Sequence, residues 1–317
     1  MSDAVWAGVD IGGTKTAVLL ASDPPAVLDR TEFPTLPAEG PERAIALIVR
    51  TLRELAGARS LRGIGVSCGG PLDSAAGVIQ APPNLWTWVD VPIKAVLEQE
   101  FGVTCGLEND ANAGAVAEHR FGAGRGTRNM VFLTMGTGLG AGIIADGRLY
   151  RGTCDAAGEI GHVRLTRSGP MGYHKAGSVE GWASGGGLGR LATEVVKKQG
   201  SLGHQTSLAA CLERNGTITA RDVADAARQG DALAKKLIRD TGKRLGETLA
   251  ILVDILNPER IVIGGLAMRL GDDLLKPARV VLAREALPGS AAVCQIVPAE
   301  LDERIGDIAA LCIAMGS

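Results

Sequence analysis

Apolar residues in the first half of the chain gather in short runs separated by turns rich in glycine and proline. Runs over residues 5–10 and 16–21 predict two β-strands joined by the turn Ile11-Gly-Gly-Thr-Lys15. Over residues 41–56, apolar residues recur every three or four positions behind a proline, which predicts a helix. The other elements predicted here are, in chain order, loops at 23–25 and 34–41, a strand at 63–68, a Gly/Pro-rich stretch at 69–92, a helix at 93–101, a strand at 101–107 and a helix at 113–119.

The second half of the chain restarts this pattern. A strand at 129–134, a glycine turn at 135–140 and a strand at 141–146 repeat the order of the first hairpin, which we interpret as an internal duplication. The elements predicted after it are a helix at 180–199 interrupted at 185–187, a helix from Thr219 to near Gly230, a helix at 232–256, a strand at 260–265, a helix at 270–286, a strand at 292–297 and a helix at 306–315. Strands alternating with helices indicate an α/β protein, and 317 residues are enough for two domains.

Composition and charge exclude several classes of protein. A net charge of −2 without a Lys/Arg block argues against a surface for nucleic acid or for an anionic membrane. No apolar run approaches the ~18 residues of a membrane helix, and the N-terminus lacks the basic start of a signal peptide, so we expect neither. The six cysteines are dispersed without a CxxC pair, which favours reduced thiols in a cytoplasmic protein.

The segment Leu107-Glu-Asn-Asp-Ala-Asn112 joins a predicted strand to a predicted helix. Asn109 and Asp110 therefore occupy the position of a helix cap, where free N–H groups and the helix dipole keep a carboxylate ionised. Ligands of α/β sheets bind at strand ends, so Asp110 can accept a proton from a substrate hydroxyl. A capping aspartate alone more often serves stability, and the glycine turns on either side of it favour the catalytic interpretation.

The two glycine turns fit neither common nucleotide motif. In the first turn Thr14 separates Gly13 from Lys15 and a strand follows, so the Walker A pattern fails. In the second, the strand at 141–146 leaves no helix for a dinucleotide pyrophosphate. Plain hairpins would explain the glycines but not the polar residues Asp10, Thr14, Lys15 and Thr137.

A pair of phosphate-binding hairpins explains these polar residues better. Backbone N–H groups of the two turns would face phosphate from two sides. Asp10 would hold Mg²⁺ through water, Lys15 would offer a charge to a phosphate, and Asp110 would face the acceptor hydroxyl. Such a site predicts phosphoryl transfer, which depends on positioning and charge neutralisation more than on a strong base.

Four motifs together resemble the ROK family of bacterial sugar kinases and related regulators. They are Asp10-Ile-Gly-Gly-Thr-Lys15, Glu108-Asn-Asp-Ala-Asn112, Leu133-Thr-Met-Gly-Thr-Gly-Leu-Gly140 and Gly158-Glu-Ile-Gly-His162. The resemblance covers nearly the whole chain and implies an actin-like ATPase (hexokinase-type) fold of two α/β lobes around a central cleft. It places the lobes at 1–118 with the C-terminal helix 303–317, and at 119–302. It also implies ATP, Mg²⁺, transfer to the 6-hydroxyl of a hexose or N-acetylhexosamine, and a homodimer.

The resemblance assigns roles to individual positions of this sequence. Asp110 matches the catalytic base. The residues that match sugar ligands are Asn84, Asn109, Asp110, Glu159, His162 and Glu180. The residues that match the nucleotide and magnesium site are Asp10, Gly12, Gly13, Thr14, Lys15, Gly136, Thr137, Gly138, Gly264 and Gly265.

One segment departs from the family pattern. The family places three zinc-binding cysteines shortly before the glutamate that corresponds to Glu180, and here the segment reads Met171-Gly-Tyr-His-Lys-Ala-Gly-Ser178. His162 alone cannot make a closed zinc site, which is built from Cys and His ligands. We therefore expect no zinc, and expect packing by Met171 and Tyr173 and hydrogen bonds from Ser178 to orient Glu180.

Several activities are compatible with these motifs. The leading interpretation is a glucokinase-type hexokinase, followed by a kinase for N-acetylmannosamine or N-acetylglucosamine, and then a fructokinase. A sugar-responsive repressor would need a DNA-binding domain ahead of Asp10, and we expect no room for one. A sugar sensor without catalysis conflicts with the intact Asp10, Lys15 and Asp110. The sequence does not distinguish glucose from its epimers.

Overall fold

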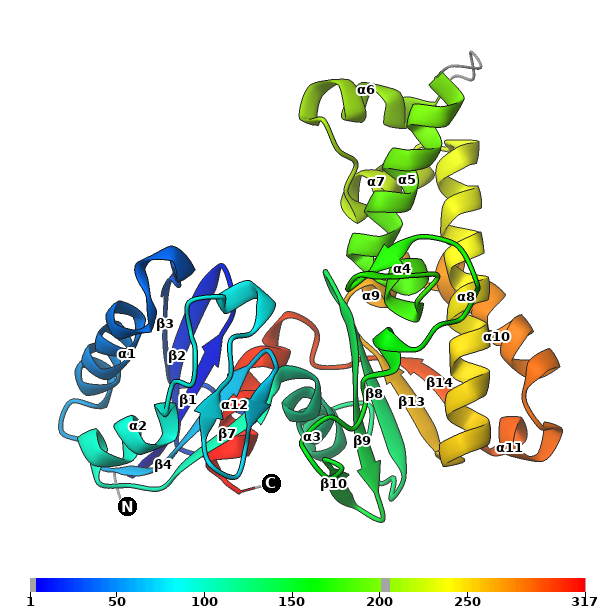
Figure 1. Ribbon diagram of the computed structural model, residues 1–317. Coiled ribbons are helices and arrows are strands. Elements are labelled where there is room, and N and C mark those ends of the chain that lie inside the picture. The colour runs from blue at the N-terminus through cyan, green and yellow to red at the C-terminus, as the bar shows by residue number, and fades with distance from the viewer. Residues whose placement is uncertain (1–3, 201–205, 317) are drawn as a thin grey trace. The chain divides into compact units, whose positions relative to one another are not determined.

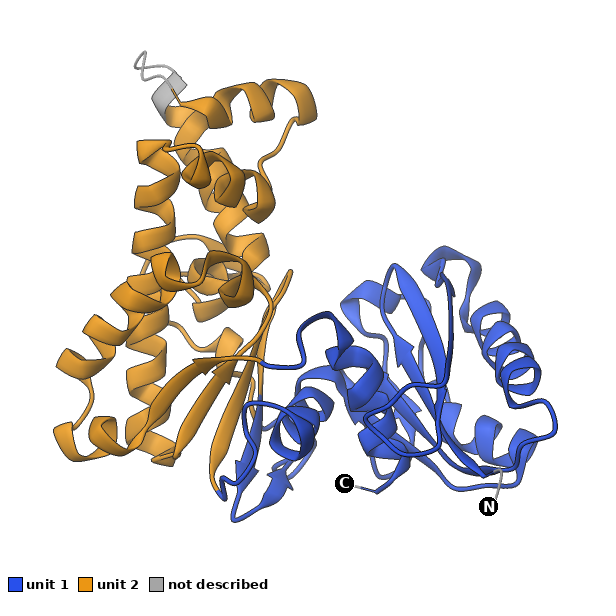
Figure 2. Ribbon diagram, turned by 180° about the vertical axis from the view of Figure 1, so that it is seen from behind, with its two compact units in different colours: residues 1–128, 142–157, 300–317 blue, residues 129–141, 158–299 orange. Residues whose placement is uncertain are grey.

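The computed structural model describes residues 4–200 and 206–316, which form two compact units (Figure 2). Unit 1 comprises residues 1–128, 142–157 and 300–317, and unit 2 comprises residues 129–141 and 158–299. We expected no signal peptide at the N-terminus. Residues 1–3 of that stretch lie outside the described residues. The lobe limits implied by the family resemblance stay a prediction.

Unit 1 is built on a five-stranded sheet with the order β3-β2-β1-β4-β7 (Figure 1). Its strands are β1 (Val5–Ile11), β2 (Lys15–Ala21), β3 (Asp29–Pro34), β4 (Leu61–Cys68) and β7 (Cys105–Asn109). β1 pairs with β2 as the predicted antiparallel hairpin, and pairs in parallel with β4. The strand β3 was not predicted, because this polar edge strand buries too little for an apolar pattern.

Helices cover both faces of this sheet. They are α1 (Pro41–Ala56), α2 (Ile93–Phe101), α3 (Asp110–Phe121) and α12 (Ile305–Ala314). Val18 and Leu20 of β2 belong to the core that includes α1, whereas Leu19 and Ala21 pack with Leu311 of α12. Because successive strand residues point to opposite faces, burial on both sides explains the continuous apolar run of β2. The short elements of this unit are η1 (Pro37–Glu39), β5 (Leu72–Asp73), β6 (Val78–Ile79), η2 (Pro83–Leu85) and η4 (Asp302–Arg304).

A second sheet has the order β10-β9-β8-β13-β14. Its strands are β8 (Met130–Met135), β9 (Leu139–Ala145), β10 (Arg148–Tyr150), β13 (Arg260–Ile263) and β14 (Gln295–Pro298). When the five strands of each sheet are numbered along the chain, both sheets have the spatial order 3-2-1-4-5. This shared order confirms the internal duplication that the two glycine hairpins indicated.

Most of unit 2 is helical. Its helices are α4 (Val179–Ala183), α5 (Gly185–Gly200), α6 (Ser207–Asn215), α7 (Ala220–Arg228), α8 (Ala232–Leu256), α9 (Leu266–Leu270), α10 (Asp272–Glu285) and α11 (Pro288–Val293), with η3 (Ile160–His162) and the small hairpin of β11 (Met171–Gly172) and β12 (Lys175–Ala176). α8 and α10 pack closely, since a Cβ added at Gly242 would lie 2.5 Å from the Leu274 carbonyl oxygen. Within the described residues, no helix is both long enough and apolar enough to cross a bilayer.

Several predicted boundaries in unit 2 are corrected by the structure. The predicted helix at 180–199 is two helices that meet at Ser184, and the predicted helix at 270–286 breaks at Gly271, where φ is +51°. The predicted strand at 292–297 starts only at Gln295, because α11 occupies the residues before it. α6 was missed. The capping box of Thr219 and Asp222 opens α7 as predicted.

Candidate active site

The junction between β7 and α3 carries the predicted catalytic carboxylate. The Asn109 side-chain oxygen accepts a hydrogen bond from the Ala111 N–H at 2.9 Å, which confirms the predicted cap. Asp110 Oδ1 accepts from the same N–H at 2.8 Å, and the Asp110 side chain is exposed. The strand expected at 101–107 begins only at Cys105, because Phe101 still belongs to α2 and Gly102 ends that helix with a left-handed φ of +65°.

A buried carboxylate beneath this junction was not singled out from the sequence. Glu108 is fully buried, and its Oε1 accepts hydrogen bonds from the Asn109 N–H and the Asn112 Nδ2, both at 3.0 Å. Its Oε2 accepts from Arg151 Nε at 2.7 Å. A charged side chain inside an apolar strand needs a partner, so the sequence could have marked Glu108 as a paired carboxylate. It could not have named the partner, because Arg151 is 43 residues away. Through these hydrogen bonds Glu108 fixes the backbone at the start of α3, which carries Asn109 and Asp110.

Asp10 lies in β1, one residue before the end of the strand, and is close to Asp110. Burial, together with the negative charges of Asp110 and Asp307, raises the pKa of Asp10 to about 6, and a hydrogen bond with Ser67 and the charge of Lys15 oppose this rise. A cation between such carboxylates would relieve their repulsion, so the donor set fits Mg²⁺. The described residues include no cluster of three or more His, Cys, Asp or Glu side chains able to enclose a metal ion.

The turn between β1 and β2 brings Asn84 to the first glycine hairpin. The Gly12 N–H donates to the Lys15 carbonyl at 2.9 Å, which closes the turn. A Cβ added at Gly13 would lie 2.6 Å from the Asn84 Cβ, so only glycine permits this contact. Thr14 lies in the same turn, and its carbonyl accepts a hydrogen bond from the Thr35 N–H at 3.1 Å. The Lys15 ammonium group pairs with Glu32 at 2.9 Å on the surface.

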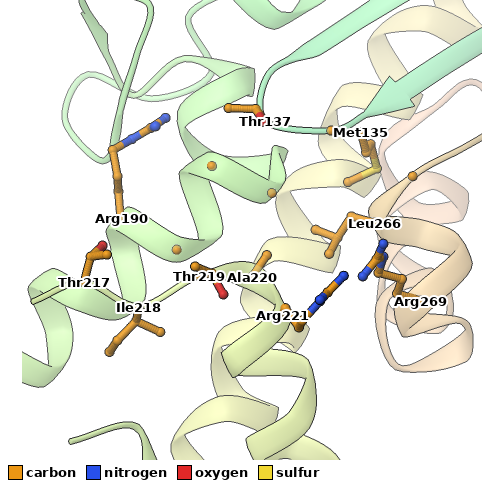
Figure 3. A pocket seen from close by; sticks show the side chains of 15 residues that line it. Met135, Thr137, Arg190, Thr217, Ile218, Thr219, Ala220, Arg221, Leu266 and Arg269 are labelled. Carbon is orange, nitrogen blue, oxygen red and sulfur yellow. The ribbon is translucent and has the colours of Figure 1, made fainter. Parts of the chain in front are cut away.

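In unit 2, the turn between β8 and β9 lines a cavity of about 500 Å³ (Figure 3). Gly185 and Gly186 at the start of α5 donate backbone hydrogen bonds to the carbonyls of Gly136 and Thr137, at 2.8 and 3.1 Å. The cavity is also lined by the start of α7 and by α9. The described side chains around it include Arg190, Arg221 and Arg269 but no carboxylate, so the cavity suits an anion such as a nucleotide phosphate.

Gly264 and Gly265 follow β13 at this cavity. Gly265 lines it with a φ of +63°, and an added Cβ would meet the Met135 carbonyl oxygen at 2.4 Å. Only glycine fits there. Gly264 is buried against Phe132 and does not line the cavity, so its place behind the turn is structural.

The predicted sugar ligands of unit 2 lie around the same β8–β9 turn. Glu180 Oε2 accepts a hydrogen bond from the Leu139 N–H at 3.3 Å and lies 2.8 Å from the position of a Cβ on Gly138. Glu159 directly precedes η3, which ends at His162, and both residues are exposed. A Cβ at Gly161 of η3 would lie 2.0 Å from the Leu139 carbonyl oxygen, so η3 packs directly on the turn.

Hydrogen bonds hold the segment in which the family's cysteines are absent. Ser178 Oγ caps α4 by accepting from the Gly181 N–H at 3.2 Å, as its predicted role requires. Lys175 Nζ donates to the His162 carbonyl at 2.7 Å. Met171 and Tyr173 do not pack into the protein as expected, because they are 49% and 60% exposed.

Comparison with known proteins agrees with this architecture. The sequence profile of the ROK family matches residues 6–316. The glucokinase of Halalkalibacterium halodurans is 37% identical over 295 residues, which is 91% of this chain and 88% of that protein. The glucokinase of Thermotoga maritima is 34% identical over 307 residues, or 96% of both chains.

Two solved structures show the same fold. The ROK hexokinase of Thermus thermophilus has a TM-score of 0.81 and 30% identity, with 98% of both chains covered. The ROK family glucokinase of Streptomyces griseus, solved with glucose and AMPPNP, also gives 0.81 and 30%, with 99% of this chain and 100% of that chain covered. The fold is that of the actin-like ATPases. With its family motifs at these strand ends and turns and a match along nearly its whole length, the chain belongs to the ROK family.

Proposed function

We propose that this protein is an ATP-dependent hexokinase that phosphorylates glucose at its 6-hydroxyl. The observation that carries the proposal is the exposed Asp110 carboxylate at the β7–α3 junction, with the buried Asp10 close enough to feel its charge. A base at a helix start and a second carboxylate suited to Mg²⁺ are the groups that phosphoryl transfer to a hydroxyl needs. The glucokinases among the relatives support glucose as the acceptor.

In the proposed reaction, Asp110 accepts the proton of the 6-hydroxyl while that oxygen forms a bond to the γ-phosphorus. The bond from the γ-phosphorus to the bridging oxygen breaks, and ADP leaves with the electron pair. Backbone N–H groups of the turns around Gly12 and Gly136 would hold the phosphates, and Gly265 would border the nucleoside. Bound Mg²⁺ would neutralise charge on the phosphates, and Asp10 would hold it through water.

We assign the sugar hydroxyls to the side chains that the family resemblance implies. Asn84 and Asn109 would donate and accept hydrogen bonds, and Glu159, His162 and Glu180 would serve as further ligands. Carboxylates and amides suit this task because each oxygen can accept from a hydroxyl. Support comes from Glu180, which is half-buried beside the Gly138 turn and is therefore held at the phosphate-binding element.

We also propose that the protein acts in the cytoplasm as a homodimer. All six cysteines are free thiols, which is typical of reducing compartments. The dimer is an expectation from the family. Light scattering on the purified protein measures it directly, and a mass equal to one chain at micromolar concentration would contradict it.

An ADP-release assay over a panel of sugars tests the proposed activity. The panel contains glucose, mannose, fructose, N-acetylmannosamine and N-acetylglucosamine, with a reaction lacking sugar as the control. We expect glucose to give the highest kcat/KM and NMR of the product to place the phosphate on the 6-oxygen. Strong turnover of an N-acetylhexosamine without phosphorylated glucose would replace glucose as the substrate. ADP release that no sugar accelerates would reject the kinase.

A further inference from the structure

The two-residue turn of the β11–β12 hairpin has an unusual backbone. Met171 pairs with Ala176 and Gly172 with Lys175, which leaves Tyr173 and His174 as the turn. Their φ angles are +40° and +61°. Turns with two positive φ angles favour Asn and Gly, because a bulky side chain is strained in the left-handed region. Strain of this kind persists only where the surrounding structure imposes it, and it concentrates at functional sites.

The base of this hairpin is anchored on the elements that carry the assigned sugar ligands. A Cβ added at Gly172 would lie 2.5 Å from the Gly181 nitrogen and 3.0 Å from the Glu180 Cβ, so the strand lies directly on α4. Lys175 Nζ donates to the His162 carbonyl, and Arg190 Nε donates to the Met171 carbonyl at 3.1 Å. The base of the hairpin is therefore held by α4, α5 and η3.

The strained tip presents an aromatic ring beside His162. The Tyr173 ring lies edge-on to the His162 imidazole, with 5.9 Å between the centroids, and the His174 ring flanks it at 5.7 Å. Tyr173 is 60% exposed, and its hydroxyl makes no hydrogen bond to any described residue. A strained backbone thus holds a large aromatic side chain in solvent, which burial does not explain.

We propose that Tyr173 is a sugar-contacting residue that determines which hexose this protein accepts. Its ring offers an apolar face to the C–H groups of a pyranose, and its unpaired hydroxyl can hydrogen-bond a sugar hydroxyl. The inference rests on the proposed function, since His162 and Glu180 are its neighbours as assigned sugar ligands. The segment that lacks the zinc-binding cysteines thereby contributes a side chain that reads the substrate.

The double variant Tyr173→Asn/His174→Gly tests the proposal, because it gives the turn its preferred residues. We expect its melting temperature to equal or exceed that of the wild type. The KM for the best sugar should rise by at least about tenfold, the scale of losing one substrate contact, while the KM for ATP stays unchanged. Tyr173→Phe, which keeps the ring, should retain most of the affinity but alter the ranking of the epimers.

His174→Gly is the matched control, because it relieves strain in the same turn and keeps Tyr173. Its KM for the sugar should stay within about twofold of the wild type, well below the tenfold effect of a lost contact. A double variant with the wild-type KM and epimer ranking would overturn the proposal. A clearly lowered melting temperature of the double variant would also overturn it, because the turn would then serve folding. ADP release by the wild type that no sugar accelerates would instead reject the proposed function itself.

Discussion

Asp10 and Asp110 show how environment separates two residues of the same type. Asp110 is exposed and accepts a hydrogen bond from the first turn of α3, where the helix dipole favours a carboxylate. The Asp10 side chain is largely buried near the end of β1, and a Cβ on Gly306 would lie only 2.3 Å from its Oδ2. The pKa of Asp10 is raised to about 6 by burial and by neighbouring carboxylates. The exposed carboxylate suits proton transfer, and the buried one suits a cation.

Asp110→Asn should lower kcat by at least ~100-fold, because the amide keeps the shape of the side chain but cannot accept the proton. Binding of an ATP analogue and the melting temperature should change little. Steady-state kinetics and calorimetry measure these quantities. Asp90→Asn is the matched control at another exposed aspartate, with a φ of +50° that asparagine also tolerates. An Asp110→Asn variant that retained most of its turnover would refute the role of base.

Asp10→Asn should change how stability depends on pH. The pKa of Asp10 is about 6 in the folded protein, above its ordinary value of 3.8, so the folded state holds an extra proton between these values. Stability of the wild type therefore falls as pH rises through about 4 to 6, by at most about 3 kcal/mol for this group. The variant lacks this loss and should be more stable than the wild type at pH 7.5 but not at pH 4.

Urea unfolding at the two pH values measures this difference. A wild-type advantage at pH 7.5 would contradict the raised pKa. Because Mg²⁺ needs the ionised carboxylate, the concentration of Mg²⁺ that gives half-maximal turnover should fall in the wild type from pH 5 to pH 7.

At the scale of elements, glycine decides how closely helices approach strands. A Cβ at Gly65 of β4 would lie 2.1 Å from the Ala310 carbonyl oxygen and 2.3 Å from the Ala314 nitrogen of α12. These are backbone atoms, so no side-chain rotation can relieve the overlap.

Gly65→Ala should therefore destabilise the protein by about 3 kcal/mol or more, at the upper end of overpacking costs. Gly289→Ala is the control, since nothing lies within 4 Å of its Cβ position in α11. It should be neutral or stabilise by up to about 1 kcal/mol. Urea denaturation compares them, and equal midpoints would refute the close packing of α12 on β4.

The segment at 171–178 is the second element with a testable consequence. Lys175 and Ser178 supply hydrogen bonds where thiolates are lacking, and the two strands of the hairpin pair through their backbones. We expect protein purified without added metal to contain far less than one zinc per chain by elemental analysis. After treatment with a chelator, the addition of excess Mg²⁺ should restore full turnover. Near-stoichiometric zinc at His162 would contradict this prediction.

At the scale of the whole molecule, ligand binding should appear as added stability, because a ligand of the folded state alone shifts the unfolding equilibrium. At ~100 times its dissociation constant, a sugar should stabilise the protein by about 2.7 kcal/mol. Glu159→Ala should lose most of this shift for glucose and keep the shift caused by an ATP analogue. Differential scanning calorimetry measures both shifts. A Glu159→Ala variant with the full glucose shift would remove Glu159 from the sugar site.

The sequence by itself determined the elements whose signals are local. Periodicity located α1 and α8, the polar residues Asn109 and Thr219 marked the starts of helices, and the repeated hairpins indicated an internal duplication. These features depend on residues within a few positions of one another, where side-chain spacing and backbone capping are decisive. The family motifs came from the same local stretches.

Only the tertiary structure decided which distant groups meet. Glu118 is fully buried in α3, where it accepts hydrogen bonds from the N–H groups of Glu300 and Leu301, more than 180 residues later. Lys15 pairs with Glu32 because β3, an edge strand without an apolar pattern, lies beside β2. Tyr173 meets His162 because its hairpin rests on α4. Such pairings minimise the free energy of the whole fold, and no local pattern encodes a partner so far along the chain.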